Sequence, residues 1–132
     1  MALEVGLDGK ATMQVGPADT AVAFGSGDVD VLATPRVVAL CEEAAVAAAA
    51  GHLDEGSTTV GTRVSLDHLA PTPMGGRVEA TATLERVDGR TLEFSIAAAD
   101  EAGQIASGLH VRVVVGREKF QTAATDRLID SP

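Results

Sequence analysis

Three polar side chains stand out in the sequence because together they could break an acyl bond: Thr34, Glu42 and His68. A carboxylate can attack a carbonyl carbon or activate water, an imidazole can shuttle a proton, and a hydroxyl can position either group. This combination suits acyl transfer. Each residue also has a structural explanation, so the elements that carry them must be considered.

Residues 34–51, TPRVVALCEEAAVAAAAG, have the pattern of a helix. Thr34 is a good N-cap, and Pro35 suits the first helical position because its missing N–H has no partner there. Gly51 is typical of a helix C-terminus. N-capping alone would explain Thr34, which is the alternative to a chemical role.

Glu42 lies within the apolar stripe of this helix, whereas Glu43 shares a solvated face with Arg36. The stripe comprises Val38, Cys41, Ala45, Ala48 and Ala49. A buried carboxylate is costly unless it is paired, hydrogen-bonded or placed beside a cavity. We therefore expect Glu42 to face the sheet beside a pocket. The alternative is that it extends to solvent from the edge of the stripe.

His68 ends a strand predicted over residues 60–68. Alternation places on one face Val60, Thr62, Val64, Leu66 and His68. A histidine at the end of an apolar strand face is often structural. An inward His and an inward Glu on facing elements nevertheless favour one shared pocket.

The remaining elements predict an α+β fold. A short strand (10–15) precedes the helix, and alternating strands follow near residues 78–85, 92–98 and 104–115. Asp88-Gly89 marks a hairpin, Gly108 a bulge, and the tail from about Gln121 is predicted to be mobile. A helix wrapped by a curved antiparallel sheet is the hot-dog architecture, and a generic α+β sandwich is the alternative.

Composition limits the classes of function. The 132 residues suit one domain, with 45% hydrophobic residues but only 2% aromatic ones. A net charge of −9 and few aromatic side chains argue against a nucleic-acid-binding protein. The single cysteine, Cys41, is consistent with the cytoplasm, and no segment resembles a membrane span. The three histidines show no metal-ligand spacing, so neither metal nor cofactor is expected.

From about Val31 to Phe120 the sequence resembles the fluoroacetyl-CoA thioesterase family, a hot-dog-fold group acting on short acyl-CoA esters. The similarity is carried by VLATP with LCEEA, by VGTRVSLDHLAPTPMGGRV, and by LERVDGRTLEFSIAAADEAGQIASGLHVRVVV followed by EKF. No single motif is specific, but their order and spacing together are.

The resemblance implies a set of roles. Thr34, Glu42 and His68 match the family's catalytic triad, with Glu42 as nucleophile or general base, His68 assisting proton transfer and Thr34 orienting the carboxylate or substrate. Gly61 matches a glycine near the thioester carbonyl, and Arg112 an arginine at the pocket.

The resemblance also implies a homodimer with sheets joined side by side and active sites near the interface. The substrate would be an acyl-CoA, whose phosphates need basic residues; the candidates are Arg63, Arg77, Arg86 and Arg90.

The sequence departs from the family in the loop before Thr34. In the fluoroacetyl-specific enzyme a phenylalanine-bearing lid precedes the threonine, but GSGDVDVLAT is shorter and contains no aromatic residue, and Asp28 or a neighbour takes that place. We therefore expect a small-acyl thioesterase without fluoroacetyl selectivity. A non-catalytic hot-dog dimer that binds an acyl-CoA or another small apolar ligand is the alternative. A hot-dog dehydratase fits less well, because SLDHLAPTP does not supply its acid and histidine from one strand–helix segment.

Overall fold

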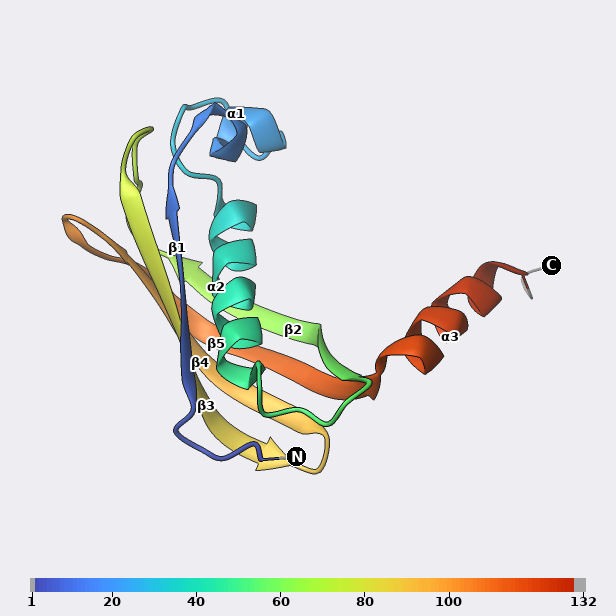
Figure 1. Ribbon diagram of the computed structural model, residues 1–132. Coiled ribbons are helices and arrows are strands. Elements are labelled where there is room, and N and C mark those ends of the chain that lie inside the picture. The colour runs from blue at the N-terminus through green and yellow to red at the C-terminus, as the bar shows by residue number, and fades with distance from the viewer. Residues whose placement is uncertain (1, 130–132) are drawn as a thin grey trace.

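A curved antiparallel sheet holds one long helix in its concave side in the computed structural model, which describes residues 2–129 (Figure 1). The strand order is β1-β3-β4-β5-β2, and every neighbouring pair is antiparallel. The elements are β1 (Asp8–Gln14), η1 (Pro17–Asp19), α1 (Ala21–Phe24), α2 (Thr34–Ala49), β2 (Ser57–His68), β3 (Arg77–Asp88), β4 (Thr91–Asp100), β5 (Gly103–Gly116) and α3 (Arg117–Ile129). The predicted α+β hot-dog fold is confirmed.

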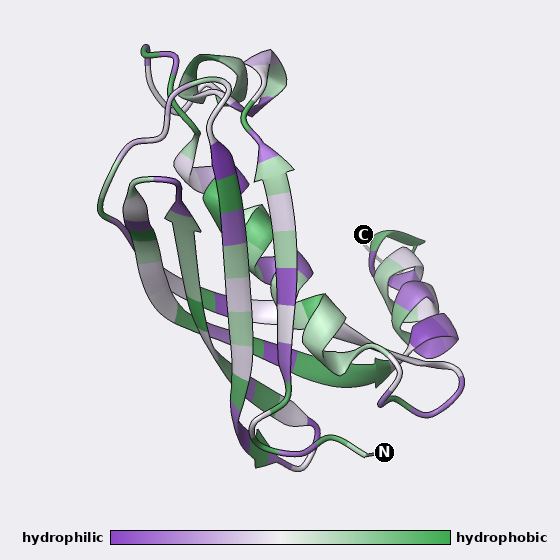
Figure 2. Cartoon of the chain, turned by 60° about the vertical axis from the view of Figure 1, so that its left-hand side comes forward, coloured by the Kyte–Doolittle hydropathy of each residue, from purple (hydrophilic) through white to green (hydrophobic). Residues whose placement is uncertain are grey.

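Small side chains let α2 lie close to the sheet. Ala44, Ala45 and Ala48 are almost fully buried against alternating inward residues of the strands, such as Ala80 and Ala82. A side chain at Gly9 of β1 would collide with the backbone of α2 at Ala44 and Ala48. Figure 2 shows the matching alternation of hydrophilic and hydrophobic bands along the strands. This packing fixes α2 over the β1–β3 half of the sheet.

A bulge in β2 changes which residues face the helix. Gly61 pairs with Arg112 and Arg63 with Val111, so Thr62 is an extra residue. The prediction that Val60 shares a face with His68 is therefore wrong, because the bulge reverses the alternation between them. It is Gly61 that faces α2 on this part of the strand.

Two other expectations also differ from the structure. The first strand starts earlier than predicted, at Asp8, and ends at Gln14. Gly108 pairs in register with Leu66 and Ile96 and forms no bulge. A side chain there would collide with the carbonyl of Ser65, so this glycine is explained by the close approach of two strands.

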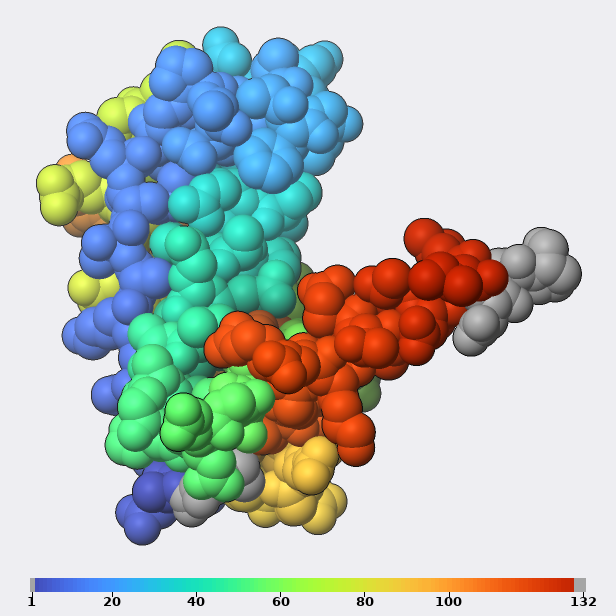
Figure 3. Space-filling model, turned by 45° about the vertical axis from the view of Figure 1, so that its right-hand side comes forward, coloured from blue at the N-terminus to red at the C-terminus, as the bar shows by residue number. Residues whose placement is uncertain are grey.

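The chain after β5 is helical, although the sequence shows no clear period there. Residues Arg117–Ile129 form α3, which projects away from the sheet (Figures 1 and 3). None of its residues is buried, so the burial periodicity that marks α2 is missing here. Residues 130–132, the end of the predicted tail, lie outside the described part. Within residues 2–129, no helix has the length and hydropathy needed to cross a membrane.

Candidate active site

The hydroxyl of Thr34 and the ring of His68 are in direct contact, as the joint hypothesis requires. Thr34 Oγ1 lies 2.8 Å from Nδ1 of His68. Thr34 is not the N-cap, because Ala33 takes that position with extended backbone angles and no side-chain cap bond. The hydroxyl of Thr34 therefore contacts His68 and does not cap the helix, so the prediction that Thr34 is the N-cap is wrong.

The other ring nitrogen of His68 has no partner in the described part of the chain. Nε2 is buried and forms no hydrogen bond with any residue of 2–129. A buried polar nitrogen without a partner is unfavourable. It is therefore a position at which a bound molecule or a second protein chain could supply the missing hydrogen bond.

Glu42 is not buried as predicted, since 40% of its side-chain surface is exposed. The buried stripe of α2 is centred on Val37, Leu40, Cys41 and Ala44, so Glu42 occupies its edge. From there its carboxylate lies over β2 and β5, where Nη1 of Arg112 donates a hydrogen bond to Oε2 at 3.4 Å. The carboxylate is therefore held by a cation and still accessible. Glu43 is exposed on the same face as Arg36, as predicted, and the two side chains form an ion pair.

Arg112 is fixed in place by three further hydrogen bonds. Its Nε donates to Oγ1 of Thr59 at 2.9 Å, and its Nη2 donates to the carbonyl of Thr59 at 3.0 Å. Its Nη1 lies 3.1 Å from Nε2 of His110, and Nδ1 of His110 lies 2.8 Å from the carbonyl of Arg63. Because a carbonyl only accepts, Nδ1 carries the proton and Nε2 accepts from the guanidinium. Burial lowers the pKa of Arg112, and the charge of Glu42 opposes that shift.

Gly61 makes room for the carboxylate. A Cβ atom at this position would lie 2.7 Å from Oε2 of Glu42 and 3.3 Å from Nη1 of Arg112. The backbone of β2 can therefore pass directly beside the ion pair. Gly61 and Arg112, expected at the site by resemblance, are both next to Glu42.

The five predicted residues form two groups along α2. Thr34 and His68 form the first, and Glu42 with Gly61 and Arg112 the second. Glu42 lies eight positions after Thr34 on the helix, a rise of about 12 Å. No hydrogen bond or ion pair joins Glu42 to Thr34 or His68 anywhere in residues 2–129. A single chain thus presents two separate polar groups between α2 and the strands, where the sequence predicted one cluster.

The chain also offers cavities away from these groups. A pocket of about 230 Å³ is lined mostly by residues on the face of the sheet turned away from α2, including Arg63, Ser65, Leu109 and Val111. His68 itself borders a shallow pocket with Leu69, Ala70 and Pro71. The described residues contain no group of His, Cys, Asp and Glu side chains that could hold a metal ion.

Sequence reasoning missed two residues of the second group, Thr59 and His110. Both are buried, and both contact Arg112. The signal for His110 was present, because His110, Arg112 and Val114 alternate along an otherwise apolar strand. For Thr59 no such signal existed, since the bulge in β2 hid its inward position.

Comparisons with known proteins identify relatives of this chain. The family model described as fluoroacetyl-CoA-specific thioesterase matches residues 15–118. The fluoroacetyl-CoA thioesterase of Streptantibioticus cattleyicolor is 42% identical over 91 residues, which are 69% of this chain and 66% of that protein, just under two thirds of its length. A solved structure of the fluoroacetyl-CoA thioesterase FlK has a TM-score of 0.89 at 32% identity and covers 98% of both chains. A thioesterase superfamily member from Thermus thermophilus has a TM-score of 0.87 at 26% identity, covering 96% of this chain and 93% of its own.

Proposed function

The chain belongs to the fluoroacetyl-CoA-specific thioesterase family, a family of thioester hydrolases, and we propose that it hydrolyses a small acyl-CoA through Thr34, Glu42 and His68. The observation that carries this proposal is the position and exposure of the Glu42 carboxylate. Its carboxylate is held by Arg112 and remains partly exposed. It lies beside β2 at Gly61, where the strand has no side chain. A reacting carbonyl group therefore has room to approach the carboxylate oxygen.

Two routes lead from this arrangement to the same products. In one, a carboxylate oxygen of Glu42 attacks the thioester carbon, the C–S bond breaks, and the thiolate takes a proton by way of His68. Water then hydrolyses the resulting anhydride and restores the carboxylate. In the other, Glu42 takes a proton from water as the water oxygen attacks the same carbon, the C–S bond breaks, and the thiolate takes a proton by way of His68. In both routes Arg112 restrains Glu42, while Thr34 restrains the ring of His68.

We propose that the active enzyme is a homodimer formed at β2. This strand is 12 residues long, lies at the edge of the sheet, and pairs within residues 2–129 only with β5. A free strand edge of this length is a template for pairing with another chain. Side-by-side pairing of two copies would bring polar groups of the second chain toward those of the first. This supports a site in which the two groups on α2 are completed across the interface.

The acyl group is proposed to be small but not specifically fluoroacetyl. The loop between Phe24 and Thr34 contains no aromatic residue, and the side chain of Phe24 is itself half-exposed on α1. A lid that selects fluoroacetyl by apolar closure would need such a residue in the loop. We also place the protein in the cytoplasm, because its single cysteine offers no internal disulfide.

The decisive experiment measures free thiol release from acyl-CoA esters of acetyl, fluoroacetyl, medium-chain and aryl type. Wild-type protein is compared with Glu42→Gln and with the matched control Glu43→Gln. We expect Glu42→Gln to lose at least about 100-fold in kcat on the preferred ester, and Glu43→Gln to retain it. Equal activity of the two variants would refute the role of Glu42.

A second pair of variants tests the first group. Thr34→Val removes the oxygen that contacts Nδ1 of His68, while Thr34→Ser keeps it. Since Thr34 is exposed, we expect no loss of stability from either variant. We expect Thr34→Val to lower kcat by about 10-fold and Thr34→Ser to restore most of it. If no ester is hydrolysed but CoA esters bind, the non-catalytic alternative replaces this proposal.

A further inference from the structure

Three basic side chains gather at the base of α3, and none of them has a carboxylate partner within residues 2–129. Arg90 belongs to the turn between β3 and β4, and Arg117 and Lys119 belong to the first turn of α3. In the described part of the chain none of the three forms an ion pair or a side-chain hydrogen bond. Four other basic residues do contact a carboxylate: Lys10, Arg36, Arg86 and Arg112.

Two adjoining pockets connect these three side chains. One, of about 370 Å³, is lined by Asp54, Ser57, Arg90, Val114, Val115, Gly116 and Lys119. The other, of about 280 Å³, is lined by Gly56, Gly116, Arg117, Glu118 and Lys119. They share Gly116 and Lys119, so they surround the same end of β5. Three cations and two carboxylates line this surface, in a protein whose net charge is −9.

The distance from Glu42 to this surface is close to the length of the arm that joins the sulfur of CoA to its pyrophosphate. Arg112 contacts Glu42, and Gly116 follows four residues later on β5, which corresponds to about 14 Å along an extended strand. In a CoA thioester, the arm between the sulfur and the pyrophosphate contains two amide linkages. Fully extended, it spans about as much as four to five peptide residues, roughly 14–16 Å. A thioester whose carbonyl lies at Glu42 therefore has the reach to bring its phosphates to the base of α3.

We propose that Arg90, Arg117 and Lys119 bind the phosphate groups of the CoA portion of the substrate. The proposal rests on the proposed function, because it assumes that the thioester lies at Glu42. An acidic protein repels a polyanionic ligand, so local cations are needed where the phosphates bind. Guanidinium groups can bind phosphate oxygens in a bidentate manner, and an ammonium group binds them as a point charge.

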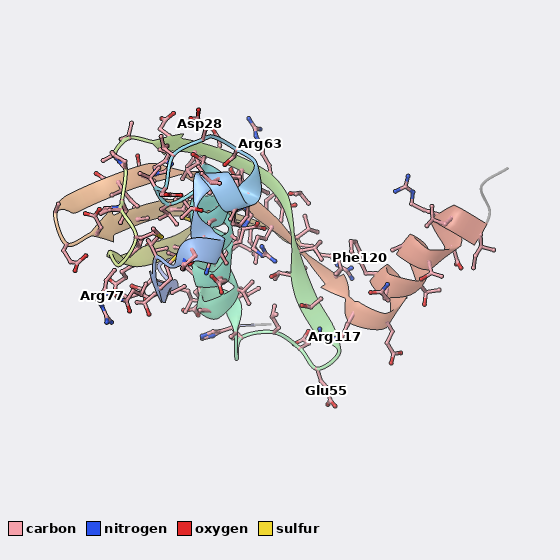
Figure 4. All side chains as sticks on the ribbon, turned by 90° about the horizontal axis from the view of Figure 1, so that it is seen from above. Asp28, Glu55, Arg63, Arg77, Arg117 and Phe120 are labelled. Atoms are coloured by element: carbon pink, nitrogen blue, oxygen red, sulfur yellow. The ribbon has the colours of Figure 1, made fainter. Side chains whose placement is uncertain are left out.

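The other arginines considered from the sequence are less suitable as phosphate ligands. Figure 4 shows Arg63 and Arg77 well away from Arg117, which lies with Phe120 at the base of α3. Arg86, a candidate from the sequence, already contacts Asp88 and Glu93. Of the four arginines considered from the sequence, only Arg90 lies in this surface.

The test compares the double variant Arg90→Gln/Lys119→Gln with Arg127→Gln, a control on the same helix outside both pockets. Binding of CoA is measured by isothermal titration calorimetry at low and high salt. We expect the dissociation constant of the double variant to rise about 5- to 20-fold at low salt, and the difference to shrink at high salt because of screening. Circular dichroism melts establish that all variants are folded.

A kinetic measurement provides a second readout. The ratio of kcat/KM for an acyl-CoA to that for the corresponding acyl-pantetheine should fall about 5-fold or more in the double variant and stay at the wild-type value in Arg127→Gln. An unchanged ratio together with unchanged CoA binding would overturn the proposal. If the protein hydrolyses no ester but CoA binding is weakened only in the double variant, the phosphate site stands and the proposed function fails.

Discussion

Nη1 of Arg112 lies 3.4 Å from Oε2 of Glu42, and it joins the only carboxylate on the apolar edge of α2 to a buried network in the sheet. The guanidinium is almost fully buried, while the carboxylate is partly exposed. The pair therefore has one fixed member and one accessible member. This arrangement suits a carboxylate that must keep its orientation while it meets a ligand.

Replacing Arg112 should destabilise the fold as well as the site. In Arg112→Met, the acceptors on Thr59 and His110 lose their donors in a buried environment. We expect the free energy of unfolding to fall by about 2–4 kcal/mol, measured by urea denaturation followed by circular dichroism. Arg36→Met, which breaks only more exposed pairs with Asp19 and Glu43, should cost about 1 kcal/mol or less. Equal losses would contradict the role given to the buried network.

Gly61→Ala should separate activity from stability. The new Cβ would lie 2.7 Å from the flexible end of Glu42, which can rotate away. It would also lie 3.2 Å from Cε1 of His110 and 3.3 Å from Nη1 of Arg112, contacts that need only a small shift. We expect thiol release to fall at least about 10-fold, with a melting temperature within a few degrees of wild type. Gly108→Ala is the contrasting variant, because its Cβ would meet the backbone of Ser65. A Gly61→Ala protein with full activity would show that this approach does not position Glu42.

Cys41 should be unreactive in the folded protein. Burial, and to a lesser extent the charge of Glu42, raises the pKa of its thiol to about 11. Since the thiolate is the reactive form, a disulfide reagent at pH 8 should label less than about a tenth of the folded protein in minutes and all of it in denaturant. Rapid labelling of native protein would show that α2 opens. The same inertness keeps Cys41 from contributing to a thiol-release assay.

Asp100 should make stability depend on pH in the acid range. The hydroxyl of Thr72 donates to Oδ2 at 2.7 Å and the amide of Ala102 donates to Oδ1 at 2.8 Å, and these bonds lower the pKa of Asp100 below 3.8. Its contribution is therefore complete above about pH 4 and is lost as the pH falls through the lowered pKa. Urea denaturation from pH 2.5 to 6 should show a smaller acid loss in Asp100→Asn. Parallel profiles for the two proteins would contradict this assignment.

The alternation of apolar and polar residues, together with the residues typical of helix ends and turns, predicted most of the fold. The alanine run ending at Gly51 and the hairpin at Asp88-Gly89 are local features, because they depend on residues that are neighbours in sequence. The bulge after Gly61 depends on the register between β2 and β5, which a single strand does not encode. It reversed the predicted face of Val60.

Predicting the site required more than identifying its residue types. Thr34 and His68 are indeed in contact, and Gly61 and Arg112 lie beside Glu42. The helical wheel placed Glu42 in the stripe, but an offset of the buried face toward Leu40 and Ala44 moved it to the edge. That offset comes from the close packing against β1 and β3, a tertiary effect. The distance between the two groups likewise depends on where β2 crosses α2.

β1 touches the backbone of α2 at Gly9, with no layer of side chains between them. Because no side chains separate α2 from β1 here, the two backbones cannot approach more closely. We expect this helix and this strand to move together as one rigid body. On the opposite flank, α2 meets β2 and β5 through Glu42, whose partly exposed side chain can change rotamer while the buried Arg112 stays fixed. We therefore expect side-chain motion that admits a ligand on that flank, while the alanine-rich half stays closed.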